Sequence, residues 1–156
     1  MKNFLTTLII AYSGFALLVF LAVKVFMLFL DPISSNVEVA RIISPDQNLV
    51  AFVIETNGGA TTSFGYVVKI QGRHQAPDLS KNVASLYGAV RSSCAYGVDL
   101  EWQSNDVLLI KYLEAKNVKF TSDTIIIRDK NINVKLISGI TNSSAPCGGM
   151  EYSLKR

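Results

Sequence analysis

A long apolar segment near the start of the chain constrains the rest of the fold. Residues 4–30 read FLTTLIIAYSGFALLVFLAVKVFMLFL and carry one charge, on Lys24. As a helix the segment would measure about 40 Å, whereas a bilayer core needs about 30 Å. Asp31-Pro32 follows it, and proline disfavours helical backbone in the residue before it. The sequence predicts one transmembrane helix through residues 4–30, within a membrane anchor of residues 1–31.

The segment is better explained as a retained anchor than as a cleaved signal peptide. It exceeds the apolar core of a signal peptide, about 7–15 residues, and no A-x-A site follows it. Lys2 and the terminal amine lie on one side, against Arg41 on the other and Lys24 near the far end. This small charge bias places the N-terminus in the cytoplasm. We therefore expect a single-pass protein of the inner (cytoplasmic) membrane, with its C-terminal domain in the periplasm or outside the cell.

The charge of the remaining chain argues against a nucleic-acid partner. The 156 residues include 15 Lys+Arg and 12 Asp+Glu, for a net charge of +3. Without Lys2 and Lys24, residues 31–156 hold 13 basic and 12 acidic residues. Nucleic-acid domains present a clustered basic excess because phosphate contacts supply most of their affinity. This domain lacks that excess, so we expect no nucleic-acid partner.

Alternating apolar and polar residues indicate β-strands after a short linker, residues 32–36. Turn sequences at 44–48, 104–106 and 129–131 separate pairs of such runs, as in hairpins. Residues 118–120 read as an edge, 83–90 as either a strand or a short helix, and 139–156 as a loop. The sequence thus predicts an all-β domain, residues 37–156, of antiparallel hairpins in a small sheet or sandwich. The expected strands are 37–44, 49–56, 64–71, 98–103, 107–113, 124–128 and 132–138.

Two local patterns resemble known proteins. Ser44-Pro45-Asp46, followed by LVAF at 49–52, resembles the S-P-D-G-K-x-[IL]-A-[FY] hairpin of TolB-like β-propeller blades. A propeller needs at least about four blades of ~40 residues, so this resemblance implies only a blade-like hairpin. The wider pattern, SPD, then GATT at 59–62, then a strand with Trp102, resembles small uncharacterised bacterial membrane-anchored proteins. No activity follows from either resemblance.

The two cysteines bear on the compartment. Cys94 lies in SSCAYG and Cys147 in APCGGM, both turn-like contexts. In an exported domain they are expected to pair, stabilising it by about 4 kcal/mol in the chain-entropy model. The alternative is two unpaired thiols in a cytosolic domain. His74 is the single histidine and no C-x-x-C spacing exists, so we expect no metal site and no cofactor.

No residue pattern predicts catalysis. His74 lies in a polar loop, and the chain lacks a G-x-S-x-G motif. Asp99 and Glu101 share one strand face by period two, and paired carboxylates can hydrolyse glycosides. Such a pair is more typical of a solvated strand face, with Leu100 and Trp102 turned to the core. We therefore expect no catalytic residues and no enzymatic activity.

The loop at residues 57–63, which is rich in glycine and hydroxyl groups, is the candidate contact region. It lacks the G-K-[ST] ending of a phosphate-binding loop, and no helix pattern follows it. We expect a membrane-anchored extracytoplasmic binding or structural module, with a protein partner in the envelope. The alternatives are an immunity or inhibitor protein against an envelope-acting toxin and, less favoured, an envelope hydrolase. The candidate binding residues are Asn57, Gly58, Gly59, Thr61, Thr62 and Ser63.

Overall fold

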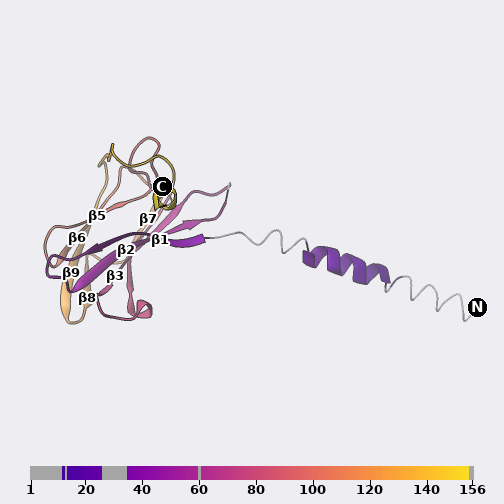
Figure 1. Cartoon of the computed structure of the whole chain (residues 1–156), viewed down its shortest axis with the longest axis horizontal. Helices are drawn as coiled ribbons and strands as arrows, with labels where there is room; N and C mark the ends of the chain where they lie inside the picture. Colours follow the sequence, from indigo (N-terminus) through magenta and orange to yellow (C-terminus); the bar gives the residue numbers. More distant parts are fainter. Residues whose placement is uncertain (1–11, 13, 26–34, 60, 155–156) are drawn as a thin grey trace, which may run out of the picture. The chain divides into compact units, whose positions relative to one another are not determined.

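The computed structural model describes residues 12, 14–25, 35–59 and 61–154, and divides into two units, 1–33 and 34–156 (Figure 1). In the first unit, residues 14–25 form an α-helix. Among the described residues, this helix is too short to cross a membrane and no other is long and apolar enough. Residues 4–11, 13 and 26–30 of the predicted transmembrane helix lie outside the described residues. The membrane anchor therefore stays a prediction.

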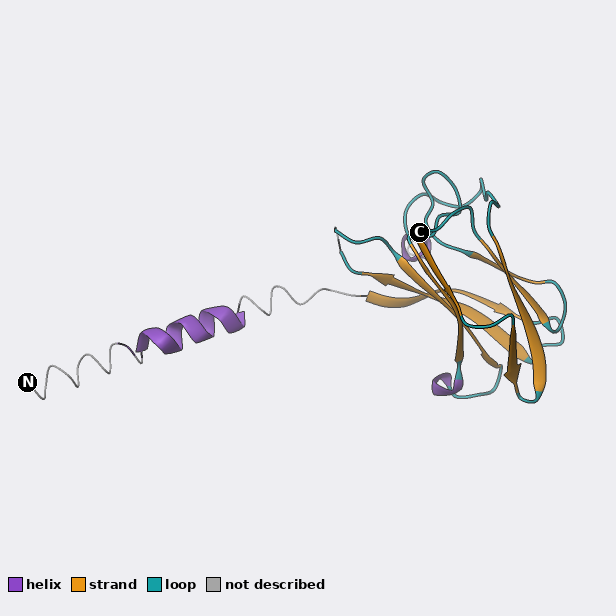
Figure 2. Ribbon diagram, turned by 180° about the vertical axis from the view of Figure 1, so that it is seen from behind, coloured by secondary structure: helices purple, strands orange, loops and turns teal. Residues whose placement is uncertain are grey.

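The second unit is an all-β domain of two facing sheets, as Figure 2 shows, which confirms the all-β part of the predicted fold class. The five-stranded sheet has the order β1 (Ser35–Ile43), β2 (Leu49–Asn57), β3 (Gly65–Gly72), β4 (Lys81–Tyr87), β7 (Asn117–Phe120). The four-stranded sheet has the order β5 (Asp99–Trp102), β6 (Val107–Lys111), β9 (Lys130–Ile137), β8 (Thr124–Ile127). The architecture is a β-sandwich with one sheet entirely antiparallel and one mixed.

The core lies between the two sheets and follows from the alternation of the strands. On β2 the side chains of Leu49, Ala51 and Val53 face inward and are buried. Val53 pairs with Val68 on β3, so the inward positions of neighbouring strands align across the sheet. The second sheet contributes branched residues to the same cluster: Leu108, Ile110, Ile125, Ile127, Ile132 and Val134. Burying this apolar surface is the main force that holds the sheets together.

Serine–aspartate turns close the two hairpins that the sequence predicts most clearly. Between β1 and β2 the Ser44 hydroxyl donates to Asp46 Oδ1 at 2.7 Å and accepts from Leu49 N at 3.0 Å. Between β5 and β6 the Ser104 hydroxyl donates to Asp106 Oδ1 at 2.5 Å. One of these hairpins belongs to each sheet, so each layer of the sandwich contains a hairpin closed by a serine–aspartate hydrogen bond.

Several details differ from the sequence prediction. Strand β9 runs parallel to β6, which hairpin signals cannot reveal because the two strands are not consecutive. The tight turn before β9 is Arg128–Asp129, one residue earlier than expected, with φ of 50° and 62°. The ambiguous segment at 83–90 contributes a strand, β4. Short helices occur outside the predicted strands: η1 (Pro77–Leu79), and α2 (Met150–Leu154) within the segment predicted as a loop.

Candidate functional site

The predicted contact loop joins β2 to β3 and is folded back on itself by its own polar groups. The Asn57 side-chain oxygen accepts from Gly59 N at 3.0 Å, and Gly59 has a φ of 92° that favours glycine. The Gly59 carbonyl accepts from Thr62 N at 3.1 Å and from the Thr62 hydroxyl at 3.2 Å. Thr61 is exposed and makes no side-chain hydrogen bond within the described part of the chain. Of the two threonine hydroxyls, Thr61 is therefore the one available to a partner.

Ser63 fixes the loop to two neighbouring segments. Its backbone N–H donates to the Tyr87 hydroxyl at 2.9 Å, and its side-chain oxygen accepts from Lys116 Nζ at 2.6 Å. Tyr87 ends β4, and Lys116 immediately precedes β7. Through these bonds the rigid five-stranded sheet carries the loop, as binding loops commonly require.

Aromatic side chains surround the base of the loop. Tyr87 is 43% exposed and Tyr96 is 38% exposed. Phe64, the residue after the loop, packs against Tyr96 with ring centroids 5.1 Å apart. A hollow of about 400 Å³ lies beside Tyr96 and is also lined by Glu114 and Lys116. We name residues 57–63, apart from the undescribed residue 60, together with Tyr87, Tyr96 and Lys116, the loop surface.

Sequence reasoning placed the loop but missed Tyr87, Tyr96 and Lys116. Tyr87 carried a usable signal, because the alternation of residues 83–87 puts it on the outward side with Ser85. No comparable sequence signal marks Tyr96 or Lys116 as part of this surface. They reach the loop only because β4 pairs with β7 and because the segment 88–98 folds back over the end of the sheet.

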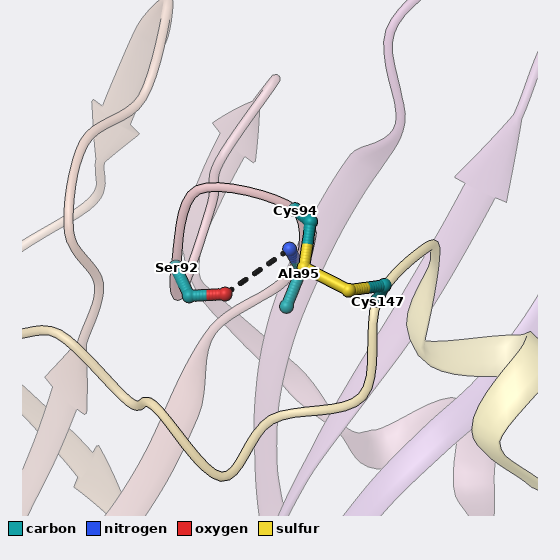
Figure 3. The surroundings of a disulfide bond; sticks show 4 residues. All are labelled: Ser92, Cys94, Ala95 and Cys147. Carbon is teal, nitrogen blue, oxygen red and sulfur yellow. Dashed lines mark hydrogen bonds between the residues drawn. A yellow bond between two sulfur atoms is a disulfide. The ribbon is translucent and has the colours of Figure 1, made fainter.

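The predicted disulfide is present: Cys94 and Cys147 are bonded across 53 residues (Figure 3). Around it the Ser92 hydroxyl accepts from Ala95 N at 3.2 Å, and the Cys94 carbonyl accepts from Gly148 N at 2.8 Å. The bond and these backbone contacts attach the C-terminal segment to the 91–97 turn, next to Tyr96. No free cysteine occurs in the part of the chain that the structure describes.

A buried carboxylate holds the C-terminal helix against the sandwich. Glu55 faces inward on β2 and is 1% exposed. It accepts from Met150 N at 2.6 Å and from Glu151 N at 3.4 Å, the first two N–H groups of α2. Burial of the neighbouring Tyr66 and the charge of Glu55 raise the pKa of the Tyr66 hydroxyl above its usual range. These groups lie inside the fold and stabilise it, and no solvent-facing chemistry results.

The two carboxylates considered for hydrolysis are each held by other side chains. Asp99 contacts Arg91 at 3.3 Å and accepts from Asn142 at 2.9 Å. Glu101 forms an ion pair with Lys111 on the adjacent strand. The two carboxylates therefore have different partners, Arg91 and Asn142 for Asp99 and Lys111 for Glu101.

The remaining sequence candidates lie apart from the loop surface. His74 is exposed between β3 and β4. Trp102 packs against the core, as expected, although its buried indole N–H has no partner among the described residues. No group of three or more potential metal ligands occurs among the described residues. No protein-family model, curated protein or solved structure matches this chain.

Proposed function

We propose that this chain is a membrane-anchored, extracytoplasmic binding module without catalytic activity, and that it contacts a protein partner through the loop surface. The observation that carries the proposal is the pair of exposed tyrosines, Tyr87 and Tyr96, beside a glycine- and hydroxyl-rich loop on a rigid sheet. Tyrosine supplies a large contact area at low entropic cost, while serine, glycine and asparagine supply adaptable hydrogen bonds.

The chemistry of the loop surface favours a protein over a small molecule. Small-molecule sites are concave and bury most of the ligand. Here the hollow beside Tyr96 is lined by only two residues of the loop surface, Tyr96 and Lys116, while Tyr87 and the loop itself lie outside its lining. Exposed aromatic anchors with a polar surround are typical of protein–protein interfaces. Lys116, although bonded to Ser63, adds a positive charge to this surface.

Two features support a location outside the cytoplasm. The disulfide between Cys94 and Cys147 favours an oxidising compartment, because cytosolic thiols are kept reduced. The apolar residues 4–30 are long enough to anchor the domain in a membrane. The inner membrane, with the β domain in the periplasm or outside the cell, is the location that we propose.

Site-specific photocrosslinking in cells tests the proposal on the full chain. We expect a photoreactive phenylalanine analogue at Tyr96 to give a crosslinked product of defined mass. The matched control carries the analogue at Ile43, an exposed residue at the opposite end of the five-stranded sheet, and should give none. Equal products at both positions, or none at Tyr96, would contradict a partner at the loop surface.

Substitution in the loop separates binding from folding. Thr61→Ala removes only the exposed hydroxyl and methyl groups of one loop side chain, so it should weaken the Tyr96 crosslink while the melting temperature stays constant. Thr62→Ala removes the bond to the Gly59 carbonyl and should lower loop stability as well. A crosslink unaffected by Thr61→Ala would move the contact away from the loop. If the crosslinked partner is a toxin, the protein is an immunity protein, a special case of the same function.

A further inference from the structure

The chain changes sheets between β7 and β8 and leaves one side of the sandwich open. Strand β7 pairs with β4 in the first sheet, and β8 pairs with residues 130–133 of β9 in the second. Residues 134–137 of β9 have β6 on one side. On their other side no strand pairs with them in the described residues, and β7 likewise has no second neighbour there. Two unpaired strand edges therefore border the same opening.

Both edges direct backbone hydrogen-bonding groups into this opening. In an antiparallel pair, bonded and non-bonded residues alternate. Since Thr121 N donates to the Val83 carbonyl, the alternation turns the backbone groups of Val118 and Phe120 away from β4. Val134 N donates to the Asp123 carbonyl, beyond the end of β8. Two residues further on, Leu136 directs its N–H and C=O to the same side, where β8 no longer lies.

Apolar side chains that should be covered are exposed in the opening. Val118 and Phe120 pair with Leu86 and Ala84, both buried core residues, so they share the inward face of the sheet. Nevertheless Val118 is 38% and Phe120 is 36% exposed. A groove of about 650 Å³ lies here, lined by Phe120, Asp123 and residues 133–137. Within the described residues, no strand covers the core on this side of the sandwich.

Two lysines lie on the strands that border the groove. Lys119 lies between the inward Val118 and Phe120, and Lys135 lies between Val134 and Leu136, so both point outward and are exposed. Neither has a carboxylate partner among the described residues. Asp123 lies at the end of the groove nearest β8 and is the one acid in its lining. These two lysines outnumber the single aspartate of the lining, so the opening carries a net positive charge.

We propose that the groove between β7 and β9 accepts one extended segment of a protein partner, as an added β-strand with alternating apolar and acidic residues. Its inward residues would cover Val118, Phe120 and Leu136, and its outward acids would lie between Lys119 and Lys135. Backbone bonds to a sheet edge supply affinity and alternate side chains supply specificity. Residues 134–137 span about 13 Å, room for about four residues of added strand.

Charge complementarity decides between the occupants of this groove. A second copy of the chain would insert its own β7, whose sequence is NVKF. The lysine of that inserted strand would then lie between Lys119 and Lys135 of the first copy. That like-charge contact disfavours an edge-to-edge dimer. A strand with outward acidic residues would instead be attracted to both lysines. This groove shares no residue with the loop surface. A result that refutes strand addition at the groove therefore does not refute the proposed function, and the reverse also holds.

Fluorescent peptide binding to the full chain in detergent micelles tests this proposal. The probes are two labelled peptides of alternating residues, one of Val and Glu and one of Val and Lys. We expect the Val/Glu peptide to bind at least about tenfold more tightly. It should also slow hydrogen exchange of the Leu136 and Phe120 amides. Lys119→Glu/Lys135→Glu should reverse the preference between peptides, whereas the control Lys69→Glu, on β3, should not.

Four results would overturn the proposal. The first is equal binding of both peptides, and the second is no binding of either at about 1 mM, the weak end of specific recognition. The third is self-association of the full chain in sedimentation, abolished by Lys119→Glu/Lys135→Glu, which would identify a second copy as the occupant. Peptide binding that protects loop residues but not Leu136 would assign the effect to the loop surface instead.

Discussion

Glu55 is the residue whose role differs most from its residue type. Glutamate is seldom fully buried unless it is paired, yet this side chain lies inside the sandwich and accepts two N–H groups of α2. The sequence contained this signal. In LVAFVIET, Glu55 falls two positions after Val53 on the apolar face, and an acid in that register predicts either a buried partner or a strand end.

Glu55→Ala should be among the most destabilising single changes in the domain. It leaves the Met150 N–H unpaired and opens a cavity, so we expect a loss of about 2–4 kcal/mol in the free energy of unfolding. Glu55→Gln keeps an acceptor oxygen and should lose about 1 kcal/mol. Urea denaturation measures both. The matched control Glu38→Ala breaks an exposed pair with Arg41 and should lose less than about 1 kcal/mol. An equal loss in Glu55→Ala and Glu38→Ala would contradict this role.

Asp46 makes the stability of the β1–β2 turn depend on pH. The Lys130 ammonium, the Ser44 hydroxyl and the Asn48 amide hold the pKa of Asp46 well below its usual range. The ionised form is therefore favoured in the folded state, while an unfolded aspartate protonates near about pH 4. Stability from this group is present above that pH and is lost as the pH falls through the folded-state pKa.

The difference in melting temperature between the natural chain and Asp46→Asn checks this dependence. We expect the difference to be largest near about pH 6 and to narrow as the pH falls below about 4, because the unfolded aspartate then binds a proton and asparagine does not. Lys130→Gln removes the largest cause of the pKa shift. The difference in melting temperature between the natural chain and Lys130→Gln should therefore narrow over the same pH range. A difference that stays constant with pH would show that the turn contacts are independent of charge.

At the scale of elements, the sequence predicted the features that depend only on neighbouring residues. The Ser44–Asp46 turn, the β5–β6 hairpin and the edge position of residues 118–120 all follow from alternation and turn residues. The parallel pairing of β6 with β9 does not, because periodicity describes one strand and says nothing about its partner. Helix α2 was missed because five residues carry no helical period, and its first N–H groups depend on Glu55, 95 residues earlier.

The candidate sites divide in the same way. The contact loop was predicted because glycine and hydroxyl residues form a contiguous string. The neighbouring Tyr96 and Lys116 and the groove between β7 and β9 were not predicted, since tertiary pairing creates them. The sheet change at residues 121–123 leaves the inward positions of β7 uncovered. No sequence pattern distinguishes an inward residue that is covered from one that is not.

The disulfide should supply a large part of the stability of the β domain. It closes a 53-residue separation, for which the chain-entropy model gives about 4 kcal/mol. We expect Cys94→Ser/Cys147→Ser to lower the free energy of unfolding by about that amount in urea. Reductant should have the same effect on the natural chain and none on the double variant. A loss below about 1 kcal/mol would show that the Glu55 bonds and the backbone bonds of Gly148 hold the C-terminal segment without the disulfide.

At the scale of the whole molecule, the two units have different chemistry. Every residue of the buried core cluster lies between Val39 and Met150, within the second unit. The described helix of the first unit instead exposes large apolar side chains, including Phe15, Leu18 and Phe20. Exposed apolar surface of this kind is uncommon on soluble monomers and marks an interaction site. A bilayer is the environment that we propose for it.

The topology prediction joins the two units. If residues 4–30 span the membrane with Lys2 inside, a reporter fused after Arg156 lies outside the cytoplasm. We expect an export-dependent phosphatase to be active there and a cytoplasm-dependent galactosidase to be inactive. A variant lacking residues 4–30 should reverse both activities. Its Cys94 and Cys147 thiols should also become open to labelling, because the cytoplasm keeps them reduced. An active galactosidase on the full chain would place the β domain in the cytoplasm and remove the basis for an envelope partner.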